Sequence, residues 1–103
     1  MTYLVHEVKH CRRGKVPEVL KDLKFVNQFL TGHGLIKNGK IYLDISDRMD
    51  TIVFDHETDS LDQYYTAQRG AYVNPSPEFR ALVDRVNSNT VVGSRQIFEV
   101  VEL

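Results

Sequence analysis

The sequence predicts an α+β fold, in which a four-stranded antiparallel sheet carries its helices on one face. Its 103 residues suit a single domain over residues 1–103, because this length lies near the commonest domain size. Segments with the alternating pattern of strands are interspersed with segments that repeat apolar residues at helical three- and four-residue steps. Their order is strand, helix, strand, strand, helix pair and strand, which gives two strand–helix–strand crossovers joined by a hairpin.

The chain begins with a predicted strand and a predicted helix. Residues 2–10 alternate between two faces, and the basic segment 11–15 ends this strand. Residues 16–31 predict a helix, since Pro17 suits a first helical turn and one face is apolar. Gly32 is placed where a left-handed residue would end the helix. The apolar stripe consists of Val16, Val19, Leu20, Leu23, Val26 and Leu30.

Two strands joined by a polar turn follow this helix. Residues 34–46 contain the first of them, and the Asn38-Gly39 pair before its main part indicates a bend or a small hairpin arm. Residues 51–57 predict the other strand. One face of that strand carries Ile52, Phe54 and His56.

Two helices and a strand complete the chain. Ser60 starts a short helix in a capping-box pattern with Gln63, and Ser76 caps a second helix. We expect Gly93 to separate the second helix from the final strand, residues 95–103.

These elements predict a ferredoxin-like βαββαβ fold with the sheet order last, first, third and second strand. The helices would cover one face, and the other would stay open. We expect the open face to carry apolar side chains, which predicts a homodimer packed sheet to sheet. The side chains expected there are Tyr3, Val5, Tyr42, Val53 and either Ile97 or Phe98.

Composition restricts the partners and the compartment. Thirteen Lys and Arg against fourteen Asp and Glu give a formal net charge of −1, which argues against binding to nucleic acid or to an anionic membrane. This near-zero net charge fits a neutral, apolar ligand, and we expect a small hydrophobic or aromatic molecule. A single cysteine, Cys11, excludes an internal disulfide, and the chain has neither a signal-peptide pattern nor a long apolar run. We therefore expect a cytoplasmic protein.

Three stretches resemble the dimeric α+β barrel superfamily, in particular its NIPSNAP-like and antibiotic biosynthesis monooxygenase-like branches. They are Gly14-Lys15 with Pro17-Glu18, residues 51–54 with 60–64, and residues 77–82 with 93–100. The resemblance implies the fold just described and a site within one subunit, between the sheet and its helices. It also implies several activities, among them cofactor-free oxygenases and cyclases of polyketide secondary metabolism, small-substrate isomerases, and haem-binding or haem-degrading proteins.

His6 and His56 are the predicted catalytic residues. They lie on neighbouring antiparallel strands, and if both face the helices their Cβ atoms are about 5–8 Å apart. An imidazole can take a proton from a phenol or an activated methylene near neutral pH and return it. The alternative is two buried, hydrogen-bonded histidines without a catalytic role.

A second cluster is the predicted substrate-binding set. A tyrosine hydroxyl or an arginine can hold a carbonyl or phenolate oxygen, whereas the alternative is that these aromatic residues only fill the core. The set consists of Phe54, Tyr64, Tyr65, Arg69 and Tyr72.

Three further polar residues, Glu7, Tyr42 and Asp44, are expected on the open sheet face, inside the dimer. There we expect hydrogen bonds or ion pairs with Lys9, Lys40 or Arg95. No metal site and no cofactor are predicted, although His33 or His56 is conceivable as a haem ligand. The leading hypothesis is a cofactor-independent oxygenase, cyclase or isomerase, in which a histidine takes a proton from an aromatic or polyketide-like substrate. The alternatives are a non-catalytic NIPSNAP-like ligand-binding or assembly domain, and a haem protein.

Overall fold

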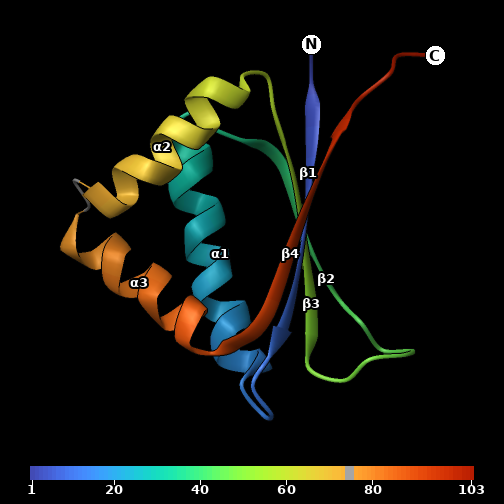
Figure 1. The fold of residues 1–103 in the computed structure, drawn as a ribbon, viewed down its shortest axis with the longest axis vertical. Helices are drawn as coiled ribbons and strands as arrows, with labels where there is room; N and C mark the ends of the chain where they lie inside the picture. Colours follow the sequence, from blue (N-terminus) through green and yellow to red (C-terminus); the bar gives the residue numbers. More distant parts are fainter. Residues whose placement is uncertain (74–75) are drawn as a thin grey trace.

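The computed structural model describes residues 1–73 and 76–103, and the side chains of residues 1–69 and 76–103. Helices of this part of the chain lie together on one face of a sheet, whose other face no described helix covers (Figure 1). The elements are β1 (Tyr3–Cys11), α1 (Val16–Gly32), β2 (Lys37–Leu43), β3 (Thr51–Thr58), α2 (Leu61–Val73), α3 (Pro77–Ser88) and β4 (Thr90–Glu99).

The sheet has the predicted strand order and direction. Its four strands are arranged β2-β3-β1-β4, and every neighbouring pair is antiparallel. The α+β ferredoxin-like fold class is therefore confirmed. The order leaves β2 and β4 at the two edges, with β1 and β3 in the centre. None of the described helices is long and apolar enough to span a membrane.

The final strand starts earlier in the sequence than predicted. β4 covers Thr90–Glu99 rather than residues 95–103, and Gly93 lies inside it, opposite Lys9 of β1. The strand can begin this early because α3 ends at Ser88 and β-branched residues, which favour strands, follow at once. The prediction of a break at Gly93 was wrong.

Two expected turns also differ in detail. The left-handed glycine after α1 is Gly34, with φ of 69°, while the helix itself ends at Gly32. Asn38 and Gly39 form a bulge inside β2 instead of a hairpin turn, since the pairing register with β3 shifts there. Asn38 has a φ of 54°, and a side chain at Gly39 would collide with the Asn27 side chain of α1.

The predicted helix starts are confirmed. The Ser76 hydroxyl accepts a hydrogen bond from the Phe79 amide at 3.2 Å, and the Ser60 hydroxyl accepts one from the Gln63 amide at the same distance. These contacts satisfy amide groups that have no partner within the helix. Pro17 occupies the first turn of α1, as expected.

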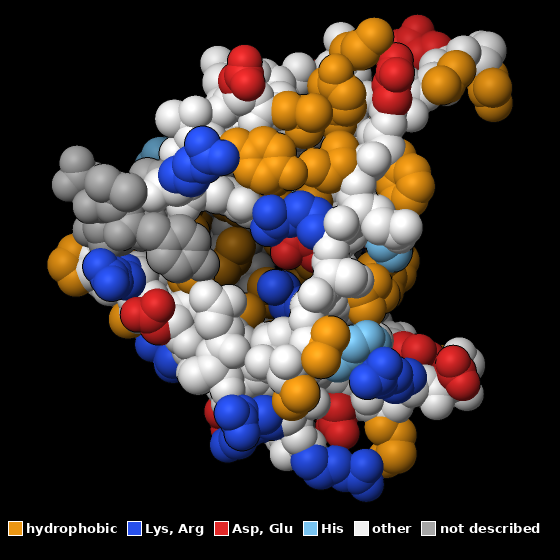
Figure 2. Space-filling view, viewed as in Figure 1, with side chains coloured by type: hydrophobic (Ala, Val, Ile, Leu, Met, Phe, Trp, Pro, Cys, Tyr) orange, Lys and Arg blue, Asp and Glu red, His pale blue; other side chains and the backbone are white. Residues whose placement is uncertain are grey.

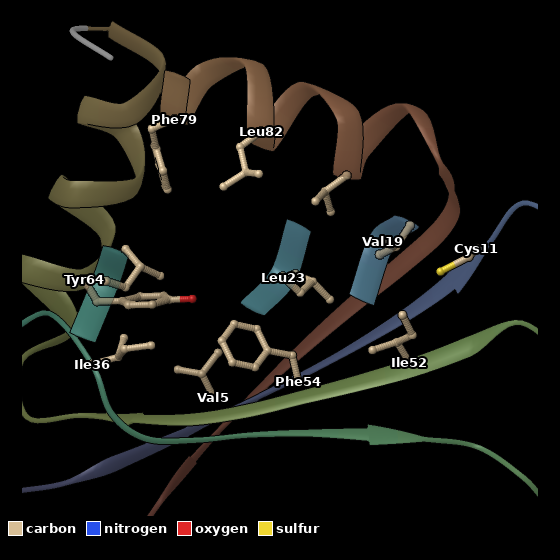
Figure 3. Close-up of a cluster of buried hydrophobic side chains, with 12 residues drawn as sticks. Val5, Cys11, Val19, Leu23, Ile36, Ile52, Phe54, Tyr64, Phe79 and Leu82 are labelled. Atoms are coloured by element: carbon tan, nitrogen blue, oxygen red, sulfur yellow. The ribbon is translucent and has the colours of Figure 1, made fainter. Parts of the chain in front are cut away.

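The core lies between the sheet and the helices (Figure 3). Phe54 of β3 and Val5 of β1 point toward α1, and Tyr64 extends from α2 with its hydroxyl directed into the same layer. Val19, Leu23 and Leu30 of α1, together with Phe79, Leu82 and Val86 of α3, supply the opposite side. Burial of these apolar side chains is what holds the helices on the sheet.

The two faces of β1 are the reverse of those predicted. Val5 is fully buried opposite His56, and Glu7 lies opposite Phe54, so both face the helices. His6 lies opposite Asp55, on the open face. The prediction that Tyr3 and Val5 lie on the open face was therefore wrong. Pairing places on that face Leu4, His6, Val8, Tyr42, Val53 and Phe98.

Candidate functional site

A cavity of about 150 Å³ lies between the sheet and the helices. Figure 2 shows the molecule hollowed there, with basic and acidic side chains beside apolar ones. The apolar part of the wall includes Leu23, Val26, Phe29 and Leu30 of α1 and Phe79, Val83 and Val86 of α3. The sheet and α2 contribute the polar part, which includes Glu7, Lys9, Gln68 and Arg95.

The Glu7 carboxylate is the centre of the polar part. Glu7 is only 8% exposed, and its Oε1 accepts a hydrogen bond from the Tyr64 hydroxyl at 3.2 Å. Lys9 Nζ lies 3.5 Å from its Oε2, and an Arg95 Nη atom lies 3.6 Å from its Oε1. A buried carboxylate needs such partners, because burial alone disfavours its charged form.

His56 and Gln68 extend this network behind the carboxylate. The Gln68 amide donates to the Tyr64 hydroxyl at 2.8 Å, and His56 Nε2 lies 3.1 Å from the same oxygen. Because the single Tyr64 proton goes to Glu7, which is acceptor-only when ionised, His56 must donate through Nε2. A neutral His56 then carries its lone pair on Nδ1, which is buried without a hydrogen-bond partner.

Both groups next to Glu7 are uncharged at neutral pH. Burial lowers the pKa of His56 below its ordinary value, and the nearby Arg95 and Lys9 charges lower it further, against the opposing effect of Glu7. Burial and the adjacent Glu7 carboxylate raise the pKa of Tyr64 well above its ordinary value. The Glu7 carboxylate is therefore surrounded by neutral hydrogen-bonding groups and two cations.

His6 and His56 do not form the predicted pair, because they lie on opposite faces of the sheet. His6 Nδ1 contacts Asp55 Oδ1 at 2.6 Å on the open face, whereas His56 is fully buried on the helix side. The expectation that both face the helices was wrong for His6. His56 does not line the cavity either, and Tyr64 connects it to Glu7.

The predicted substrate-binding residues are dispersed. Phe54 lines the cavity, and Tyr64 is buried in the network next to it. Tyr65 is partly buried and makes an edge contact with the Tyr64 ring, at 5.5 Å between centroids. Arg69 is exposed and is not part of the cavity wall. Tyr72 lies outside the described side chains.

Glu7, Gln68 and Arg95 are site residues that the sequence did not reveal. Glu7 was predicted on the open face, inside the dimer, and the pairing of β1 overturns that prediction. Arg95 lies opposite Glu7 in the β1–β4 register, a position that no local pattern encodes. The one available signal was an acidic residue in the same row of β1 as the apolar residues Tyr3 and Val5.

Asp44 and Tyr42 also take separate positions. Tyr42 is on the open sheet face as predicted, opposite Val53. Asp44 instead accepts backbone hydrogen bonds from residues 46–48, in the loop between β2 and β3. These bonds lower the pKa of Asp44 to about 2. Asp44 is therefore a loop-stabilising residue rather than a residue of the open face.

The two residues considered as haem ligands, His33 and His56, lie outside the cavity wall. His33 is exposed, and its Nδ1 is hydrogen-bonded to the Phe29 carbonyl at 2.8 Å. His56 is enclosed by Phe54 and Tyr64, at 4.5 and 5.5 Å between ring centroids. Within the described residues, no three His, Cys, Asp or Glu side chains come together as a metal site.

The lowered pKa of His56 predicts a loss of stability in weak acid. Below the ordinary histidine pKa of about 6.5, the unfolded chain takes up a proton that the folded protein rejects. This stabilisation is therefore present above about pH 6.5 and is lost as the pH falls toward the lowered pKa, by at most about 1.4 kcal/mol per pH unit.

Urea unfolding at pH 7 and pH 5 measures this effect. The His56→Gln variant should show a smaller loss of unfolding free energy between the two pH values than the unmodified protein. His33→Gln, at an exposed position, is the matched control and should keep the original loss. An unchanged loss in His56→Gln would contradict the assignment.

Solved structures with the same fold include proteins of both branches that the sequence resembles. A NIPSNAP family protein from Agrobacterium tumefaciens superposes with a TM-score of 0.74 at 16% identity, over 99% of this chain and 95% of that chain. A NIPSNAP domain protein from Burkholderia xenovorans gives 0.70 at 17% identity, over 96% and 94%. SnoaB, a cofactor-independent oxygenase from Streptomyces nogalater, gives 0.76 at 10% identity, over 99% and 95%.

These similarities confirm the sequence resemblance at the level of the fold, over nearly the whole chain. A scan against models of protein families found no match, and a search of curated proteins found none either. At sequence identities this low, the role of a residue in one protein cannot be transferred to another protein.

Proposed function

We propose that the protein is a small-molecule enzyme that takes a proton from an aromatic or polyketide-like substrate, as a cofactor-independent oxygenase, a cyclase or an isomerase. The observation that carries the proposal is the Glu7 carboxylate in the cavity wall, held between two cations at one end of an otherwise apolar space. A fixed base beside cations is what abstraction of a proton next to a carbonyl, or from a phenol, requires.

The size and lining of the cavity favour a small substrate. A dry apolar cavity of 150 Å³, made by mutation in another protein, binds benzene. The volume of about 150 Å³ found here therefore suits one aromatic ring or a short chain. Phe29, Phe54 and Phe79 offer apolar contact for such a ring, and they keep water away from the reacting atoms.

Glu7 is the proposed base, in place of the histidine pair expected from the sequence. Its carboxylate takes the proton, and the electron pair left on the substrate moves to the carbonyl or phenol oxygen. Lys9 and Arg95 stabilise the resulting enolate or phenolate. Tyr64 and His56 are positioning residues, since they hold the carboxylate from behind and do not line the cavity.

Isotope exchange and oxygen uptake test the proposal. Single-ring aryl ketones and dihydroxybenzenes would be incubated with the protein, in D₂O without oxygen and in air. We expect protein-dependent deuterium incorporation next to the ketone carbonyl. Additional oxygen uptake with the phenols would identify an oxygenase, and exchange alone a cyclase or isomerase. Binding without exchange or oxygen uptake would reject the enzyme and favour the alternative, a ligand-binding domain.

We also propose that the open sheet face packs against the same face of a second copy. Tyr42 and Phe98 are 48% and 47% exposed there. Large apolar side chains that are exposed together on one face typically mark a surface that a partner covers. The acidic groups of this face are Asp55, which is engaged by His6 and lies opposite Lys40, and Glu57, which lies opposite Lys37 and accepts a hydrogen bond from Asn38. Two copies related by a two-fold axis would therefore bring together matching apolar surfaces without a strong repulsion.

A further inference from the structure

We infer that the cavity selects small anions that have one apolar ring or chain, such as an aromatic or short-chain carboxylate. This inference rests on the proposed function and names the class of its substrate. It also replaces the neutral ligand that the near-zero net charge of the chain suggested. Its basis is the local charge balance of the cavity wall.

The described part of the cavity wall carries an excess of positive charge. Lys9 and Arg95 are its cations, and Glu7 is its single carboxylate. His56 and Tyr64, the titratable groups behind Glu7, are neutral at pH 7 because burial disfavours their charged forms. Two positive charges against one negative charge leave a net charge of about +1 at the polar end.

The cations also keep capacity to bind a second anion. Their distances to Glu7, 3.5 and 3.6 Å, are longer than the 2.7–2.9 Å typical of a full charge-assisted hydrogen bond. The Arg95 guanidinium has five N–H donors; it contacts Glu7 through one Nη atom, is hydrogen-bonded to Tyr65 and lies over the Tyr64 ring, 5.7 Å from its centroid, so some donors remain. A carboxylate or phenolate oxygen can therefore be bound without displacing Glu7.

The partial burial of Lys9 and Arg95 makes the preference for an anionic ligand strong. Lys9 and Arg95 side chains are 17% and 35% exposed, so a ligand that enters the cavity removes much of their remaining water. A neutral ligand would impose that cost without compensation, while an anion replaces the lost water with charge-assisted hydrogen bonds. A cationic ligand would add repulsion to the same cost.

Calorimetric titration with three matched probes tests the inference. Sodium benzoate, benzyl alcohol and benzylammonium chloride share one ring and differ in charge, and all are used at the same ionic strength and pH 7. We expect benzoate to bind at least tenfold more tightly than benzyl alcohol, and benzylammonium to bind weakest. Arg95→Gln should lose at least tenfold in benzoate affinity, with little change for benzyl alcohol.

Two control variants separate the site from general charge effects. Arg69→Gln removes an exposed arginine outside the cavity wall and should leave benzoate affinity unchanged. Arg95→Lys keeps the charge and should retain part of the affinity.

Equal affinity for benzoate and benzyl alcohol, or full benzoate affinity in Arg95→Gln, would overturn the anion preference and leave the proposed function standing. Absence of binding by every probe, together with no deuterium exchange, would instead reject the cavity as a substrate site.

Discussion

Replacing Glu7 by Gln should lower deuterium exchange into a bound aryl ketone by about 100- to 10,000-fold, which is the usual contribution of a general base. The amide has nearly the size of the carboxylate and can still accept the Tyr64 hydrogen bond, so the network of neutral groups can persist. It cannot take up a proton, and it no longer balances Lys9 and Arg95. Exchange is therefore expected to fail while the helices and the sheet remain.

NMR measurement of deuterium incorporation provides the rate, and circular dichroism checks the fold of the same sample. Glu18→Gln is the matched control, since Glu18 is an exposed residue in the first turn of α1 and is remote from the cavity wall. Its rate should equal that of the unmodified protein. A Glu7→Gln variant that is folded and still exchanges at full rate would exclude Glu7 as the base.

A single charge on the open sheet face should turn the proposed dimer into a monomer. Val53 lies in the middle of this face, opposite Val8 on one side and Tyr42 on the other. Val53→Asp would bury an unpaired carboxylate in each half of a symmetric interface, which costs several kcal/mol per ion. The fold within each copy should persist, because Val53 points away from the core between the sheet and the helices.

Light scattering at micromolar concentration distinguishes the two states by mass. Val91→Asp is the matched control, since Val91 is 66% exposed near the start of β4 and is outside the set of residues that defines the open face. We expect this control to remain a dimer. A monomeric mass for the unmodified protein would contradict the dimer itself, and a dimeric Val53→Asp would contradict its proposed location.

Topology could be predicted from the sequence, but the orientation of one strand could not. In β3 the row Ile52, Phe54 and His56 is buried, and its alternation with the less apolar row was enough to assign its face. In β1 both rows contain large apolar residues, Tyr3 and Val5 in one row and Leu4 and Val8 in the other. The sequence of such a strand does not show which row of side chains faces the helices. A wrong assignment places every side chain of the strand on the opposite face of the sheet.

That single error explains most of what was missed at the candidate site. It moved Glu7 away from the cavity and placed His6 in it, which led to the wrong prediction of a histidine pair. The position of Arg95 opposite Glu7 depends also on the pairing register of β4 with β1. This register could not be predicted, because β4 starts at Thr90, earlier than expected. Tyr64 belonged to the predicted substrate-binding set, but it lies behind the cavity wall, and its partners Glu7 and His56 come from strands that are distant along the chain.

The bulge in β2 bears on how the protein avoids aggregation. An edge strand exposes unpaired backbone groups, which invite strands of other molecules to add in the manner of amyloid growth. At the β2 edge, Asn38 and Gly39 interrupt the regular backbone pattern, and Lys37 and Lys40 flank the interruption with positive charge. β4 is ten residues long and has no comparable kink, apart from a register shift at its first residues. Fibril formation from the native protein would therefore start along β4, and added lysines there would delay it.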